Sequence, residues 1–166
     1  MANRSAVNPK LYNTLSPVAT NYRTLRAADS KTWKQGEFGE LSSGTVQPIS
    51  GASSAPYCIF AEDQTTSTSS SDVKVLVLED GMRFEMYVTS DGTDATIGTA
   101  NIGTGYDVYT SSNITYLDTN GTTGAQMVVE QIVDSTNTSS TAPERMAFDA
   151  QLSTTAPGLC IVRYTT

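Results

Sequence analysis

The sequence predicts an all-β protein: an antiparallel β-barrel or β-sandwich, of the tulip-like or jelly-roll type, with an extended N-terminal arm. Ser and Thr make up about a quarter of the 166 residues. They favour strands and turns, because Thr is β-branched and Ser competes for backbone hydrogen bonds. Short apolar runs are separated by turns rich in Gly, Asp and Asn. Together these features predict roughly nine or ten short strands and no long helix.

The arm is predicted to span residues 1–30, and the β-barrel or β-sandwich body residues 31–166. Apolar side chains are sparse in the arm, and Pro9 and Pro17 interrupt any regular element. A segment of this composition cannot bury enough apolar surface to fold alone. We therefore expect an extended chain with a few anchoring side chains.

Charge is divided by position along the chain. Residues 1–34 contain six basic residues and one acidic residue, a net charge of +5. Residues 35–166 contain four basic and sixteen acidic residues, a net charge of −12. A basic arm on an acidic body favours docking onto an acidic surface, which includes the body of a neighbouring copy.

The first strands of the body are predicted from turn signals. Residues 37–41 and 45–49 are predicted to form a hairpin around Ser42-Ser43-Gly44. The small polar residues of 50–54 predict a loop. Residues 57–62 form the next apolar run and predict a strand.

The strongest local signal is Glu79-Asp80-Gly81 between two β-rich runs, residues 73–78 and 82–88. Asp-Gly between such runs predicts a tight hairpin, because both residues tolerate a positive φ. In the second run apolar and polar residues alternate, which is typical of a half-buried strand. The first run is apolar on both faces, which favours a central strand.

Further strands follow in the second half of the chain. Residues 126–133 resemble a helix in their apolar pattern, but their β-branched content favours a strand. Turns are expected at Ser90-Asp91-Gly92, Ser111-Ser112-Asn113 and Pro157-Gly158. The other expected strands are 106–109, 114–117, 145–152 and 159–164.

Two cysteines, Cys58 and Cys160, each lie within an apolar run. Buried thiols that act as small apolar side chains are the favoured interpretation. A disulfide between paired strands stays open at this point, because its geometry cannot be judged from sequence. With no histidine in the chain, a metal site built on two cysteines is not expected.

The residue types disfavour catalysis. The absence of histidine removes the commonest general base and most zinc, copper and non-haem iron sites. Glu37 with Glu40, and Glu62 with Asp63, are carboxylate pairs of the kind that glycosidases use. Their positions next to turns predict solvated side chains instead. We therefore expect a protein that is not an enzyme and has no cofactor.

Four loop aspartates, Asp91, Asp94, Asp118 and Asp134, offer the oxygen ligands that Ca²⁺ prefers. They do not form the D-x-[DN]-x-[DN]-G loop of an EF-hand. Solvated turns are the favoured interpretation, so no metal site is predicted.

Nucleic acid and membranes are not expected partners. The arm could neutralise phosphates, but the same polymer would repel the acidic body. No segment has the run of about 18 apolar residues that a membrane span needs. Trp33 and Phe38 are expected in the core or as anchors for the arm.

Several consecutive segments together carry a family resemblance. They are Trp33-Lys-Gln-Gly36-Glu-Phe38, Leu41-Ser-Ser-Gly44-Thr-Val46-Gln-Pro48 and Ser50-Gly-Ala-Ser-Ser-Ala55, the last leading into Tyr57-Cys-Ile-Phe60. This order of turns and apolar strands resembles the opening of tailed-bacteriophage capsid decoration (cement) proteins. Gly81, Phe84 and Gly105-Tyr-Asp107 fit the same pattern.

The resemblance implies a homotrimer that binds the outer surface of the major capsid protein lattice, with its arm reaching over coat protein or neighbouring copies. The implied protein is a structural component of the virion, made in the host cytoplasm, and it stabilises the capsid without chemistry. The arm residues expected to make these contacts are Arg4, Lys10, Leu11, Tyr12, Leu15, Tyr22, Arg23, Leu25 and Arg26.

Two alternatives of other classes stay open. One is a carbohydrate- or receptor-binding β-domain of a tail or fibre, in which Tyr87, Tyr106, Tyr109 and Tyr116 would stack on sugars. The other is a carboxylate-dependent hydrolase that acts on polysaccharide.

Overall fold

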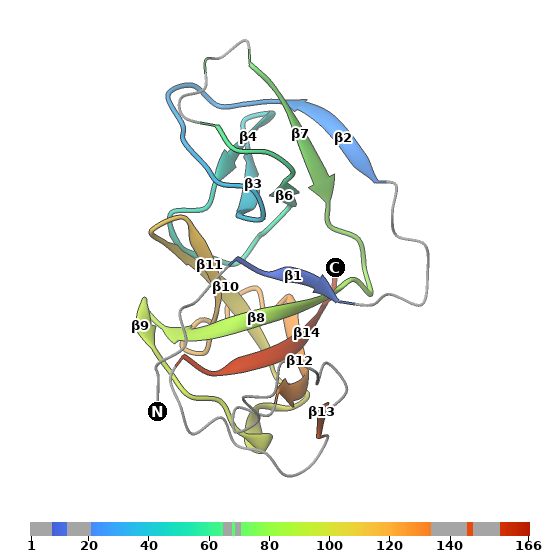
Figure 1. Cartoon of the computed structure of the whole chain (residues 1–166), viewed down its shortest axis with the longest axis vertical. Coiled ribbons are helices and arrows are strands. Elements are labelled where there is room, and N and C mark those ends of the chain that lie inside the picture. The colour runs from blue at the N-terminus through green and yellow to red at the C-terminus, as the bar shows by residue number, and fades with distance from the viewer. Residues whose placement is uncertain (1–7, 13–20, 65–67, 69–70, 134–145, 148–156) are drawn as a thin grey trace.

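The computed structural model describes residues 8–12, 21–64, 68, 71–133, 146–147 and 157–166. It confirms the all-β prediction: the strands form two sheets that lie one above the other along the long axis of the molecule (Figure 1). Each sheet curls until strands at its two ends meet. We call the resulting units the small barrel and the large barrel.

The small barrel is a five-stranded sheet. A parallel bridge between Ala27 and Val46, with the Ala28 N–H donating to the Val46 carbonyl at 2.8 Å, closes it on itself. Inside, Trp33 stacks on Phe60 with ring centroids 4.4 Å apart. The strands, in spatial order, are β2 (Tyr22–Arg26), β7 (Asp72–Val77), β6 (Cys58–Phe60), β3 (Phe38–Ser42) and β4 (Thr45–Pro48).

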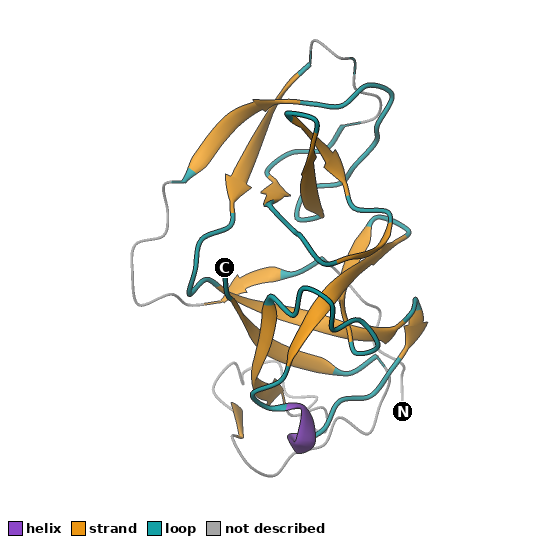
Figure 2. Cartoon of the chain, turned by 180° about the vertical axis from the view of Figure 1, so that it is seen from behind, coloured by secondary structure: helices purple, strands orange, loops and turns teal. Residues whose placement is uncertain are grey.

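The large barrel is a nine-stranded sheet whose central strands form a ring, because β10 pairs with both β11 and β12. The pairing of β8 with β11 is parallel, and the other strand pairs are antiparallel. The ring is β12 (Met127–Val133), β14 (Leu159–Tyr164), β8 (Arg83–Ser90), β11 (Ile114–Asp118) and β10 (Gly105–Ser111). The added elements are β1 (Lys10–Tyr12), β5 (Gly51–Ser53), β9 (Thr93–Asp94), β13 (Met146–Ala147) and the 3₁₀ turn η1 (Thr99–Asn101), drawn as the helix in Figure 2.

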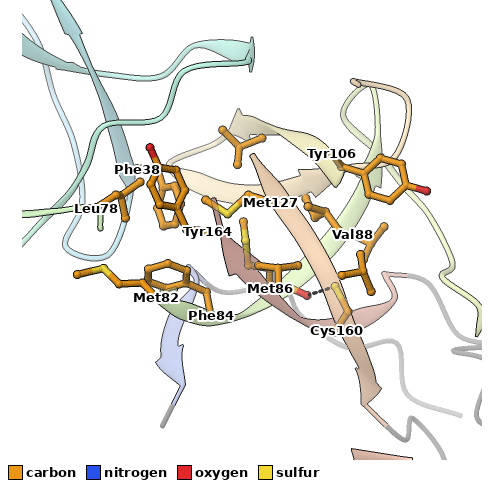
Figure 3. Packing of buried hydrophobic residues seen from close by; sticks show 14 of the residues in the cluster. Phe38, Leu78, Met82, Phe84, Met86, Val88, Tyr106, Met127, Cys160 and Tyr164 are labelled. Carbon is orange, nitrogen blue, oxygen red and sulfur yellow. Dashed lines mark hydrogen bonds between the residues drawn. The ribbon is translucent and has the colours of Figure 1, made fainter. Parts of the chain in front are cut away.

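The predicted alternation along residues 82–88 is confirmed. Phe84, Met86 and Val88 are fully buried, whereas the residues between them are half-buried. Figure 3 shows these side chains in the core of the large barrel, where Phe38 from the small barrel joins them. The Phe38 ring meets the Phe84 ring edge-on, with centroids 5.4 Å apart. The core of the large barrel therefore includes a side chain from the small barrel.

The predicted hairpin between residues 73–78 and 82–88 is wrong. Both strands form, but β7 pairs within the small barrel and β8 within the large barrel. At the turn, the Met82 N–H donates to the Glu79 carbonyl. Gly81 has a positive φ of 86°, whereas the φ of Asp80 is not positive. A type I′ hairpin needs positive φ at both residues, and this pattern is that of a type II turn, which splays the strands.

Three other predicted turns form as expected, whereas Pro157-Gly158 forms a bend and not a turn. Ser43-Gly44, Asp91-Gly92 and Ser112-Asn113 each have two consecutive positive φ values, the requirement for type I′ hairpins. Residues 126–133 contain strand β12, as predicted. Residues 50–54 were expected as a loop, but β5 forms there and pairs with β10.

The described parts of the predicted arm, residues 8–12 and 21–30, are both joined to the body. β1 is antiparallel to β8, with Lys10 opposite Glu85 and Tyr12 opposite Arg83. β2 is antiparallel to β7 along its full length. These segments are extended, but the small-barrel sheet crosses the boundary predicted at residue 30.

Candidate functional site

Three exposed residues among the predicted contacts lie on β2, an edge of the small-barrel sheet. β7 pairs with one side of β2, and Ala27, just beyond its end, bridges to β4. The Tyr22 side chain is 48% exposed, and its ring lies under the Lys74 ammonium, 4.9 Å from the ring centroid. Arg23 and Arg26 are also exposed. This edge is a fixed surface that displays an aromatic ring and two guanidinium groups.

The basic residues of this edge have local partners. The Arg23 Nε donates to the Asn21 Oδ1 at 2.9 Å. The Arg26 Nε lies 3.7 Å from the Asp72 Oδ1, and both side chains are more than half exposed. An exposed ion pair contributes at most about 1 kcal/mol. Both guanidinium groups can therefore give up these local contacts at little cost in free energy when a partner binds.

Folding redistributes the charge that the sequence divides at residue 34. The described residues of the small barrel, 21–64, 68 and 71–78, hold five basic and six acidic residues. The described remainder holds three basic and eight acidic residues. The basic segment is thus matched by acids within its own barrel, and the excess negative charge lies on the large barrel.

The remaining predicted contact residues are dispersed. Leu11 is 46% exposed on β1, which belongs to the large barrel, whereas β2 belongs to the small barrel. Leu25 is half-buried against the core of the small barrel. Lys10 and Tyr12 belong to β1, and Arg4 and Leu15 lie outside the described residues. The structure therefore does not gather the nine predicted residues into one site.

Asn8, just before β1, ties the two barrels together. Its Nδ2 donates to the Gln35 carbonyl of the small barrel at 3.3 Å and to the Asn113 carbonyl of the large barrel at 2.9 Å. Its Oδ1 accepts from the Thr115 N–H at 3.0 Å. The sequence did not predict that Asn8 links the barrels, because two of its three hydrogen bonds join it to residues more than 100 positions away.

The prediction that Glu37 is solvated is wrong. Its side chain is 2% exposed, and its Oε2 accepts from the Lys34 N–H at 3.0 Å and from the Asn113 Nδ2 at 3.2 Å. Burial raises the pKa of the Glu37 carboxyl, and these two hydrogen bonds oppose the shift. Glu62 and Asp63 are exposed as predicted, and Glu40 is half-buried.

Asp118 is also buried, contrary to the prediction of a solvated turn. It is 0% exposed, and it lies opposite Asp107, which is 6% exposed, in the pairing of β10 with β11. Asp91 and Asp94 are exposed as predicted, and Asp134 lies outside the described residues. The buried acid pair is the most unusual charge arrangement in the described residues.

The two cysteines are buried and unpaired, which confirms the favoured interpretation and removes the disulfide. Cys58 lies in the small barrel and Cys160 in the large barrel. Burial raises the pKa of the Cys58 thiol to about 12. The pKa of Cys160 is also raised, chiefly by burial. Neither thiol has the depressed pKa of a reactive cysteine.

Among the tyrosines of the sugar-binding alternative, Tyr109 and Tyr116 lie directly opposite each other on β10 and β11. Both are half-buried, and the Asp91-Gly92 turn approaches the Tyr109 ring so closely that a Cβ on Gly92 would lie 2.9 Å from it. Tyr106 is buried, and its hydroxyl accepts from the Asn101 Nδ2 at 2.7 Å. Tyr87 lies on β8 directly before Val88, which pairs with Leu117, the residue after Tyr116 on β11. The structure thus brings three of the four to neighbouring positions.

Within the described residues, no three His, Cys, Asp or Glu side chains form a group that could hold a metal ion. The described residues include no helix long and apolar enough to cross a membrane. Comparison of the chain with protein-family models, with curated proteins and with solved structures finds no match.

Proposed function

We propose that the protein is a structural virion component that decorates and stabilises a bacteriophage icosahedral capsid, as a homotrimer on the outer surface of the major capsid protein lattice. The observation that carries the proposal is the β2 edge. Tyr22, Arg23 and Arg26 are exposed on it, while the strand itself is held in register by β7. A contact surface that is ordered before binding loses little conformational entropy when it binds.

The segments that resemble decoration proteins support this proposal, because they build the barrel that displays β2. Trp33 forms the aromatic stack with Phe60 at the centre of the small barrel. Ser43-Gly44 forms the tight turn between β3 and β4. The residues of the resemblance therefore have structural roles, as expected for a scaffold that presents a surface.

Stabilisation would follow from mass action. A subunit that binds only the mature shell stabilises it by RT ln(1 + [L]/Kd), about 2.7 kcal/mol at a hundredfold excess over Kd. A trimer adds avidity, because the second and third contacts form at a high effective concentration. No new chemistry is needed.

Sedimentation of shells that lack the protein, taken from the phage that encodes it, tests the proposal. The wild-type chain should co-sediment, and a Tyr22→Ala/Arg23→Glu variant should bind at least about tenfold more weakly, since about 1.4 kcal/mol corresponds to a tenfold change. Leu41→Ala is the matched control, because Leu41 is 50% exposed in the same barrel but lies on β3. Absence of wild-type binding would reject the function, and equal loss with Leu41→Ala would reject the β2 surface.

The facing pair Tyr109 and Tyr116 favours one alternative, a carbohydrate-binding domain. Burial raises the pKa of the Tyr116 hydroxyl, and the nearby charge of Asp94 adds to the shift. Two aromatic faces beside a carboxylate suit a sugar, whose C–H face stacks on rings and whose hydroxyls donate to carboxylates. A glycan array in which the wild type binds and Tyr116→Ala does not would support it. Absence of signal from any glycan would remove it.

A further inference from the structure

We propose that the large barrel binds a divalent cation of the Ca²⁺ type between Asp107 and Asp118. These residues lie directly opposite each other on β10 and β11, at 6% and 0% exposure. Like charges directly opposite each other destabilise a sheet. A buried carboxylate is also unfavourable unless a positive charge or hydrogen bonds compensate it.

One carboxylate oxygen of the pair lacks compensation. The Asp118 Oδ1 accepts from the N–H groups of Asp91 at 3.0 Å and Asn120 at 3.2 Å. The Asp118 Oδ2 is buried and has no hydrogen-bond partner among the described residues. Buried polar atoms nearly always have a hydrogen-bond partner or a bound ion, so we expect a ligand at this oxygen.

The second carboxylate presents an oxygen to the same place. A Cβ built on Gly121 would lie 3.1 Å from the Asp107 Oδ2 and 3.2 Å from the Asp118 Oδ2. Both oxygens therefore face the side of Gly121 on which a side chain would stand. The N–H groups of Thr123, Gly124 and Ala125 hold the Asp107 carboxylate at 2.8–3.0 Å. This fixes its orientation before a cation arrives.

Within the part of the chain whose side chains the structure describes, neither aspartate forms an ion pair. Arg83 and Arg163 of the large barrel both bind Glu130 instead. The Asp91 carboxylate adds negative charge at the adjoining turn, where its Oδ2 accepts from the Nδ2 of Asn120, the residue whose N–H donates to the Asp118 Oδ1. The local field therefore attracts a cation.

Oxygen-only ligands select a hard cation such as Ca²⁺, which takes six to eight oxygens and accepts water and main-chain carbonyls among them. With two carboxylates as the side-chain ligands, the remaining positions would be filled by such oxygens. This places the affinity in the weak range of extracellular Ca²⁺ modules, about 10⁻⁴–10⁻³ M.

Thermal unfolding of the full chain tests the site. CaCl₂ at about 10 mM should raise the unfolding midpoint by roughly 3–10 °C over EDTA, whereas NaCl of equal ionic strength should not. Asp118→Asn removes one charge with little change in shape and should abolish the shift. Asp94→Asn is the matched control, because Asp94 is an exposed acid of the same barrel. It should keep the shift.

Gly121→Ala is a second variant, since its Cβ would lie within 3.2 Å of both oxygens and crowd the space beside them. It should also abolish the shift, and calorimetric titration of the wild type with Ca²⁺ should give one site per chain. An equal midpoint in Ca²⁺ and EDTA would overturn the proposal. A Ca²⁺ shift that persists in Asp118→Asn would overturn it by placing the cation elsewhere.

Discussion

The small and large barrels differ in what they bury and in what they display. The small barrel has a compact core around the Trp33–Phe60 stack, and its outer edge carries the exposed residues of β2. The large barrel has the larger core, and it also buries the Asp107–Asp118 pair. Proposed protein contacts thus fall on one barrel and the proposed ion site on the other. A chain with 38% hydrophobic residues thus forms two cores, and the larger barrel also buries a pair of aspartates.

The largest expected effect concerns whether the two cores are independent. Trp33→Ala should lower the free energy of unfolding of the small barrel by about 3–5 kcal/mol, the usual cost of deleting a large buried aromatic side chain. Phe38→Ala should cost a similar amount but destabilise both barrels, because Phe38 packs on Phe84 in the core of the large barrel. Residue-resolved hydrogen exchange measures the two responses separately.

The control is Leu41→Ala, which removes an exposed side chain from the same strand as Phe38 and should change stability little. If Trp33→Ala lowered the protection of β8 as much as that of β7, the barrels would be one cooperative unit and the comparison would fail.

The next largest effect is expected at the contacts around Asn8 that link the two barrels, which we call the joint. Asn8→Ala removes three hydrogen bonds and leaves the Asn113 carbonyl and the Thr115 N–H without this partner. We expect a loss of about 1–3 kcal/mol, measured by urea unfolding. Asn21→Ala, which removes exposed hydrogen bonds to Glu79 and Arg23, is the control and should cost less. Equal losses would show that Asn8 does not secure the joint.

The sequence predicted the local turns and strands better than it predicted which strands pair with each other. The turn at Ser112-Asn113 and the strand at 126–133 follow from residue types alone, and both are confirmed. The Asp80-Gly81 turn was also present, but its backbone leads the chain from one barrel into the other. Turn residues permit several turn types, and tertiary pairing decides between them. A hairpin prediction from such a pair therefore carries no information about which sheet each strand joins.

The polar sites were hardest to foresee, because burial arises from distant segments. Glu37 is covered together with Asn113, and Asp118 is covered as β10 aligns with β11 and the following turn folds over them. Neither residue differs from an exposed loop acid in its neighbouring sequence. By contrast, the exposure of Tyr22, Arg23 and Arg26 was anticipated, since a basic segment with few apolar residues is rarely buried.

The smallest expected effect is the pH dependence of the joint. Burial raises the pKa of Glu37 in the folded state above its value of 4.5 in the unfolded chain. The folded protein then binds this proton more tightly, so the stabilisation is complete below the unfolded pKa and is lost as pH rises through the folded pKa. Glu37→Gln keeps an acceptor for the Lys34 N–H but cannot ionise. The stability of wild type relative to this variant should therefore fall as pH rises above about 4.5.

Urea unfolding of both chains across that range measures the difference, and the comparison cancels the other titrating groups that the two chains share. Glu62→Gln controls for net charge, because it removes an exposed carboxylate from the same barrel. A wild-type curve parallel to that of Glu37→Gln would mean that the Lys34 and Asn113 hydrogen bonds fully offset the burial of the charge. In that case Glu37 would contribute no pH dependence to the contact between the barrels.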